Sequence, residues 1–108
     1  MASERFAYVW RYTIDPTHRT AFLAAYNSGG EWAQLFSRDP SYIETVLLQD
    51  DGDENRYVTI DFWKSKADRD LFRKRYSVEF ENLDSTCESF TRDEQFIGDF
   101  LEIGESTG

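Results

Sequence analysis

Asp61 and Trp63 are the two residues of this chain whose types and spacing most directly suggest chemistry. They lie two positions apart in a segment rich in β-branched and aromatic residues, so both side chains should point to one face of a strand. A partly buried carboxylate there would have a raised pKa and could act as a general base. The alternative is that Asp61 hydrogen-bonds locally or pairs with an arginine.

A set of aromatic residues shares the faces of two expected strands and the stripe of a helix. Rings gathered in this way, with a few hydroxyl and indole donors, are typical of a flat apolar slot for a planar or hydrophobic ligand. The alternative is that the same rings form ordinary core. The set is Tyr8, Trp10, Tyr12, Tyr57, Trp63 and Tyr76.

Other enzyme signatures are missing from the sequence. It contains no phosphate-binding glycine loop, no dinucleotide fingerprint and no HExxH motif. The only histidine, His18, is expected at the surface, and the only cysteine, Cys87, is expected as a small buried apolar residue. The acidic run at 50–55 lacks the ligand spacing of an EF-hand and is expected to be a hairpin loop. We therefore expect no metal site.

The patterns of the chain predict four strands and three helices. Asp15 and Pro16 begin the first helix, and Gly29-Gly30 should end it through a C-cap with positive φ. Ser65, followed by Asp68, should cap the longest helix. The expected strands span 6–14, 41–49, 56–64 and 94–101; a short helix carries Trp32, Leu35 and Phe36, and the long helix spans about 66–90 with a stripe of Phe72, Tyr76, Phe80, Leu83, Cys87 and Phe90.

The resulting order, βαββαβ, predicts an α+β fold. The common solution is the ferredoxin-like arrangement, in which one four-stranded antiparallel sheet carries both helices on a single face. We expect a single domain over residues 1–104 and a frayed tail at 105–108, ending Ser-Thr-Gly.

The expected strands carry large apolar side chains on both faces. In the third strand Val58, Ile60 and Phe62 alternate with Tyr57 and Trp63. Two helices can cover only one face of a sheet, and the other would leave a large exposed apolar patch. We therefore expect a homodimer in which two sheets pack face to face.

The charge balance restricts the partners of the chain. It has 108 residues, a formal net charge of −9 and a pI of about 4.5. An acidic surface repels phosphate backbones and anionic lipid, so nucleic-acid and membrane binding are not expected. No apolar run approaches a membrane span or has the shape of a signal peptide, and a cytoplasmic location is expected.

Two segments carry a resemblance to a known family. The run from Tyr57 to Ser65, followed by Phe72, Tyr76, Leu83-Asp84 and Glu94…Gly98-Asp99-Phe100, together with the segment from Gly30 to Phe36, resembles the antibiotic biosynthesis monooxygenase (ABM) family. The resemblance spans nearly the whole chain and implies a dimeric α+β barrel. It also implies that Trp63 faces a cavity between the sheet and the helices.

The resemblance implies two activities. Some members oxidise polycyclic phenols with O₂ and use no metal or flavin, because the substrate itself supplies the electrons. Others bind and degrade haem with a histidine early in the long helix and an asparagine on the first strand. Here those regions hold Phe72-Arg73 and Trp10-Arg11, so haem degradation is not expected.

The preferred hypothesis is a cofactor-independent monooxygenase that oxidises a small aromatic or polycyclic metabolite. Trp63, Asp61, Tyr76 and Arg73 are its candidate catalytic residues, with Arg73 as a possible oxyanion partner. One alternative is a non-catalytic ligand-binding or sensing dimer of the same fold. Another is isomerase or decarboxylase chemistry with Asp61 as the base. The candidate ligand-binding residues are Tyr8, Trp10, Tyr12, Tyr57 and Phe72.

Overall fold

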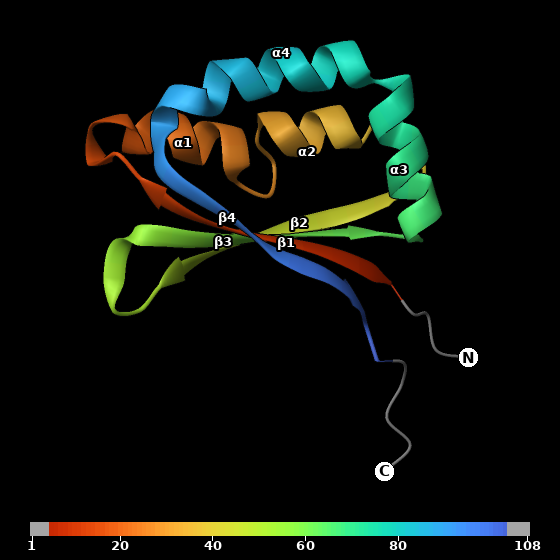
Figure 1. Cartoon of the computed structure of the whole chain (residues 1–108), viewed down its shortest axis with the longest axis horizontal. Helices are drawn as coiled ribbons and strands as arrows, with labels where there is room; N and C mark the ends of the chain where they lie inside the picture. The colour runs from red at the N-terminus through yellow and green to blue at the C-terminus, as the bar shows by residue number, and fades with distance from the viewer. Residues whose placement is uncertain (1–4, 104–108) are drawn as a thin grey trace.

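A computed structural model describes residues 5–103, and the predicted tail at 105–108 lies outside this range. One antiparallel sheet has the strand order β2-β3-β1-β4, and all the helices lie on one of its faces (Figure 1). The predicted ferredoxin-like βαββαβ fold is therefore confirmed. The elements are β1 (Phe6–Ile14), η1 (Pro16–His18), α1 (Arg19–Tyr26), α2 (Glu31–Phe36), β2 (Tyr42–Asp50), β3 (Asp53–Trp63), α3 (Lys66–Arg75), α4 (Ser77–Cys87), η2 (Glu88–Phe90) and β4 (Thr91–Leu101).

The hairpin between β2 and β3 is tighter than the sequence suggested. The predicted loop at 50–55 shrinks to Asp51 and Gly52, because Asp50 already pairs with Asp53. The Asp50 carboxylate accepts a hydrogen bond from the backbone N–H of Gly52, which closes the turn. Both hairpin strands are therefore longer than predicted and continue to the turn. Separately, β4 begins at Thr91, three residues before the predicted start at position 94.

The long helix predicted over 66–90 is two helices. It breaks at Tyr76, whose φ of −112° and ψ of 32° lie outside the helical region, and α4 then runs in a different direction from α3 (Figure 1). The two halves of the apolar stripe have different partners: the Phe72 ring lies 5.1 Å from Trp63, and the Phe80 ring lies 4.8 Å from Trp32. The bend lets one stripe contact two parts of the core. The predicted Ser65 cap is confirmed, since its hydroxyl accepts from the backbone N–H of Asp68.

The expectation that Gly29-Gly30 needs a positive φ is wrong. Within residues 5–103, the only glycine with positive φ is Gly98, and Gly30 has a φ of −81°. Gly30 is required by a close backbone approach instead. A Cβ at this position would lie 2.6 Å from the carbonyl oxygen of Ala24 and 2.7 Å from that of Ala25, whereas a Cβ on Gly29 would contact nothing.

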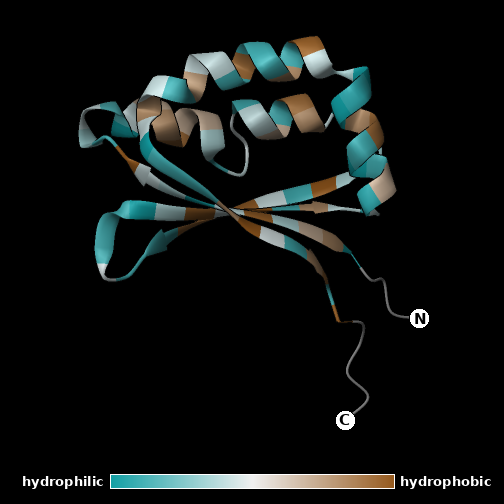
Figure 2. Ribbon diagram, in the orientation of Figure 1, coloured by the Kyte–Doolittle hydropathy of each residue, from teal (hydrophilic) through white to brown (hydrophobic). Residues whose placement is uncertain are grey.

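The core lies between the helices and the sheet. Phe22, Phe72 and Trp63 are almost completely buried there. Figure 2 shows hydrophobic colour along the strands, whereas the β2–β3 hairpin is hydrophilic. Register explains which side of each strand is covered: Tyr12 and Tyr57 are paired neighbours, and both are buried on the helix side.

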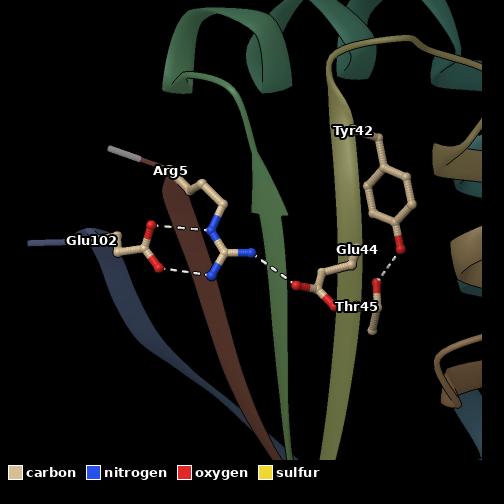
Figure 3. A network of polar contacts seen from close by, with 5 residues as sticks. All are labelled: Arg5, Tyr42, Glu44, Thr45 and Glu102. Atoms are coloured by element: carbon tan, nitrogen blue, oxygen red, sulfur yellow. Dashed lines mark hydrogen bonds and ion pairs between the residues drawn. The ribbon is translucent and has the colours of Figure 1, made fainter. Parts of the chain in front are cut away.

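The opposite side of the sheet, called here the open face, has no covering element among the described residues. Arg5 lies across it: its guanidinium donates hydrogen bonds to both carboxylate oxygens of Glu102 and to one oxygen of Glu44 (Figure 3). The same guanidinium lies 4.0 Å from the centre of the Phe62 ring. No helix in the described part of the chain is long and apolar enough to cross a membrane. The large apolar side chains of the open face include Val9, Val46, Leu48, Val58, Ile60, Phe62 and Phe100.

Candidate active site

A cavity of about 280 Å³ lies between the helix side of the sheet and the helices. This volume is close to the lower end of ordinary ligand sites, about 300 Å³. The exposed lining residues Arg73, Asp84 and Glu94 come from α3, α4 and β4, so the cavity opens between these elements. Its buried lining residues come from α1, α2 and the strands β1, β2 and β3. The lining comprises Tyr8, Trp10, Tyr12, Tyr26, Trp32, Phe36, Thr45, Thr59, Asp61, Arg73, Phe80, Asp84 and Glu94.

Asp61 is the buried carboxylate of this cavity. Its β3 position pairs with Thr45 of β2 on one side and Tyr8 of β1 on the other. Only 7% of Asp61 is exposed, and burial raises its pKa from 3.8 to about 7, although a hydrogen bond from Thr45 and the charge of Arg69 oppose the rise. At neutral pH the group is therefore divided between its acid and its base form, as a general base requires.

A short hydrogen-bond chain holds the Asp61 carboxylate. The Thr45 hydroxyl donates to Asp61 Oδ1 at 2.7 Å. The Tyr42 hydroxyl in turn lies 2.7 Å from the Thr45 hydroxyl oxygen (Figure 3). Because Thr45 has a single proton and gives it to Asp61, Tyr42 must be the donor to Thr45. This arrangement orients one carboxylate oxygen and leaves Oδ2 without a hydrogen-bond partner among the described residues.

The walls of the cavity are aromatic. The Trp10 ring lies 5.4 Å from Phe96 of the neighbouring strand, and the Tyr12 ring lies 4.9 Å from Tyr26 of α1. Burial raises the pKa of both Tyr12 and Tyr26 above the ordinary value of 10.0, so their hydroxyls remain protonated. The walls therefore offer flat apolar surface together with neutral hydrogen-bond donors.

One cation reaches the cavity. Arg73 of α3 lines it, with its guanidinium carbon 3.9 Å from the centre of the Phe80 ring. The exposed carboxylates Asp84 and Glu94 also contribute to the lining. A cation and a partly ionised carboxylate in one aromatic cavity can remove a proton from a ligand and stabilise the anion that forms.

A second, shallower hollow continues from this cavity toward the α3 end of the sheet. The two share Tyr8, Trp10 and Arg73. We call the second hollow the basic vestibule, because it adds Arg69 and Lys74 of α3 to the shared Arg73. Its remaining lining residues are Asp70, Phe96 and Asp99.

Five of the nine predicted site residues line the cavity. Asp61, Arg73, Tyr8, Trp10 and Tyr12 come together there. For Tyr8, Trp10 and Tyr12, the alternation of side chains along the first strand correctly indicated that they share one face.

The other four predicted residues are not in the lining. Trp63 is 1% exposed and packs against Phe36, a lining residue, with 5.5 Å between the ring centres. Phe72 packs against both Trp63 and Phe36, and the Tyr76 ring stacks on Phe72 at 4.9 Å. The Tyr57 hydroxyl accepts hydrogen bonds from Arg19 and Gln49 near the hairpin.

Sequence reasoning missed Thr45 and Arg69. Hairpin pairing alone does not find Thr45, because a regular two-residue turn at Asp51-Gly52 would set it opposite Val58, and only the register shift between Gln49 and Asp50 puts it opposite Asp61. Arg69 gave no sequence signal either, since its burial follows from the position of α3 against the sheet. Within residues 5–103, no group of three or more histidine, cysteine or acidic residues is placed to hold a metal ion.

Comparisons with known proteins agree with this architecture. The sequence model of the family described as antibiotic biosynthesis monooxygenase matches residues 5–79. No curated protein sequence matches the chain.

Solved structures share the fold at low sequence identity. SnoaB, a cofactor-independent oxygenase from Streptomyces nogalater, is 18% identical, with 96% of each chain covered and a TM-score of 0.67. A protein from Bordetella bronchiseptica assigned to the antibiotic biosynthesis monooxygenases is 15% identical, with 93% of this chain and 98% of that chain covered and a TM-score of 0.71. A conserved protein from Methanosarcina mazei is 10% identical, with 94% and 95% covered and a TM-score of 0.70.

Proposed function

Because the chain belongs to the antibiotic biosynthesis monooxygenase family, we propose that it is a cofactor-independent monooxygenase that oxidises a small aromatic metabolite with O₂. The observation that carries the proposal is Asp61. It is a buried carboxylate with a pKa of about 7 that faces an aromatic cavity of about 280 Å³. A substrate that becomes a good electron donor on losing a proton needs such a group and little else.

The first step of the proposed reaction is proton removal. Asp61 takes a proton from an activated C–H or phenolic O–H of the bound ring, while Thr45 holds the carboxylate in place. Arg73 stabilises the oxyanion of the resulting enolate or phenolate. The walls formed by Tyr8, Trp10 and Tyr12 orient the ring and exclude water.

Oxygen then supplies the oxidising power. The substrate anion transfers one electron to O₂, and the substrate radical and superoxide combine to form a C–O bond, giving a peroxide after protonation. For a substrate methylene, loss of water from this peroxide leaves a carbonyl. One oxygen atom enters the product, the other leaves as water, and both hydrogen atoms of that water come from the substrate.

We propose supporting roles for the predicted residues outside the lining. Trp63 and Phe72 back the wall at Phe36, so they position the cavity without contacting the ligand. Tyr76 supports Phe72 at the bend between α3 and α4. Tyr57 anchors the hairpin end of β3.

We also propose that the protein is a homodimer through the open face. Phe100 and Leu48 remain about half exposed there, and no described element covers them. A stable interface buries about 1,200–2,000 Å² in total, which a four-stranded sheet face can supply together with its copy.

The test is O₂ uptake with a panel of anthrones and naphthohydroquinones. We expect protein-dependent consumption that Asp61→Asn lowers by about 100-fold or more, because it removes the base and preserves the shape. Asp93→Asn makes the same change on β4, at a position outside the lining, and should have no effect. Ligand binding without any O₂ uptake would contradict oxygenation and support the binding-protein alternative.

A further inference from the structure

Arg69 is a buried cation with spare hydrogen-bonding capacity. The residue is 7% exposed, and its guanidinium carbon lies 4.2 Å from the centre of the Tyr8 ring. Its Nε donates to Asp70 Oδ1 at 2.9 Å, but its Nη1 has no hydrogen-bond partner and lies 3.7 Å from Asp99 Oδ1. An unpaired buried guanidinium N–H is costly, and an anionic ligand would satisfy it.

The surroundings of Arg69 favour a ligand with one negative charge. The basic vestibule contains three cationic side chains and two carboxylates, which leaves an excess of one positive charge in a chain whose net charge is −9. A monoanion would therefore be better matched than a dianion. The three cations are Arg69, Arg73 and Lys74, and the two carboxylates are Asp70 and Asp99.

The two connected hollows also define an orientation. The carboxylates Asp61, Asp84 and Glu94 line only the cavity that contains Asp61, whereas Arg69 and Lys74 line only the basic vestibule. An anionic group would be repelled from the first and attracted to the second. Tyr8 and Trp10, shared by both, offer a continuous aromatic surface between them.

From these observations we propose that the ligand is an aromatic carboxylic acid. Its ring enters the cavity beside Asp61, and its carboxylate binds the Arg69 guanidinium in the basic vestibule, with Arg73 and Lys74 adding charge. Arg69 is thus a specificity-determining residue for the site. The inference rests on the proposed function only in taking the ring as the part that is oxidised.

The experiment compares binding of 2-naphthoate and 2-naphthamide, which have nearly the same shape and differ in charge. Tryptophan fluorescence reports binding, because Trp10 lines both hollows. We expect the wild-type protein to bind the naphthoate about tenfold or more tightly, as a charge-assisted hydrogen bond at a buried site provides. Equal affinity, or a preference for the amide, would overturn the proposal.

Variants assign the preference to the vestibule. Arg69→Gln should abolish it, whereas Arg38→Gln removes an exposed arginine outside both hollows and should leave it intact. Because Arg69 also packs on Phe6 and Tyr8, Lys74→Gln serves as a second variant at an exposed position. It should reduce the preference, and added salt should reduce it further. A preference that survives both substitutions would contradict the assignment.

These outcomes separate the inference from the proposed oxygenase function. Neither naphthalene compound needs to react, so a preference for the carboxylate without any O₂ uptake would support the inference and reject oxygenation. Rapid O₂ uptake with neutral anthrones and no preference for naphthoate would support oxygenation and reject the inference about the carboxylate.

Discussion

Asp61 combines two properties that oppose each other, a buried position and an ionisable group. Its pKa is about 7 in the folded protein and near 3.8 when unfolded, so the folded state binds the extra proton between these values. Stability from this group is therefore present below about pH 4 and is lost as pH rises to about 7. At about 1.4 kcal/mol for each pKa unit, the full loss is on the order of 4 kcal/mol.

Asp61→Asn should remove this pH dependence. Asparagine keeps the shape and can still accept a hydrogen bond from Thr45, but it has no charge to bury. We expect the variant to gain about 2–4 kcal/mol in unfolding free energy relative to wild type at pH 8, and little at pH 4. Urea titrations at the two pH values measure this gain, with Asp93→Asn as the control. Parallel pH dependence in wild type and Asp61→Asn would contradict the assigned pKa.

For single residues, the sequence indicated which face of a strand a side chain occupies better than it indicated which other side chains it contacts. Alternation placed Tyr8 and Trp10 on one face of the first strand and Asp61 beside Trp63 on one face of the third, and strand pairing brings these faces together. Trp63 has the same parity, yet Phe36 and Phe72 pack around it and separate it from the cavity. Which aromatic residue lines a hollow and which fills the core depends on how the helices are placed, and strand periodicity carries no information about that.

Helix α2 is positioned by the close approach of Gly30 to α1. Its backbone lies so near the carbonyl oxygens of Ala24 and Ala25 that no side chain fits. This contact matters for the site, because α2 supplies Trp32 and Phe36 to the cavity.

Gly30→Ala should therefore destabilise the protein by about 1–3 kcal/mol, the usual cost of overpacking. Gly29→Ala is the matched control: its Cβ would have open space, and we expect a change within about 0.5 kcal/mol. Chemical denaturation of the two variants measures the difference. Equal stabilities would show that the backbone at Gly30 relaxes freely.

The bend at Tyr76 explains the error in the longest predicted helix. Phe72, Tyr76 and Phe80 keep a spacing of four residues through the break, and no glycine or proline marks it. The periodicity therefore continues while the axis turns. Arg69 and Lys74 lie on α3, before this bend, and line the vestibule together with Arg73.

At the scale of the whole molecule, element order was sufficient to predict the fold. The pattern βαββαβ has one common antiparallel solution, and the observed strand order β2-β3-β1-β4 agrees with it. The structure adds the identity of the faces: Val58, Ile60 and Phe62 point away from the helices, and Tyr57 and Trp63 point toward them.

If the open face forms the dimer, a charge at its centre should separate the subunits. Ile60 lies between Val9 and Val46 in the register of the sheet. Ile60→Glu should give a monomer in sedimentation velocity runs at concentrations where the wild type is a dimer, because an unpaired buried carboxylate is costly. Leu71→Glu makes the same kind of change at an exposed position on α3 and should remain dimeric. A dimeric Ile60→Glu variant would place the interface elsewhere.

The proposed chemistry depends on the ionised form of one carboxylate in an aromatic cavity. The most direct test is the pH dependence of anthrone-dependent O₂ uptake by the intact protein. We predict that kcat/KM rises with pH, reaches half its maximum near the Asp61 pKa of about 7 and then levels off, and that Asp61→Asn loses this activity. A rate independent of pH across this range, or an Asp61→Asn variant as active as wild type, would contradict the assignment of Asp61 as the base.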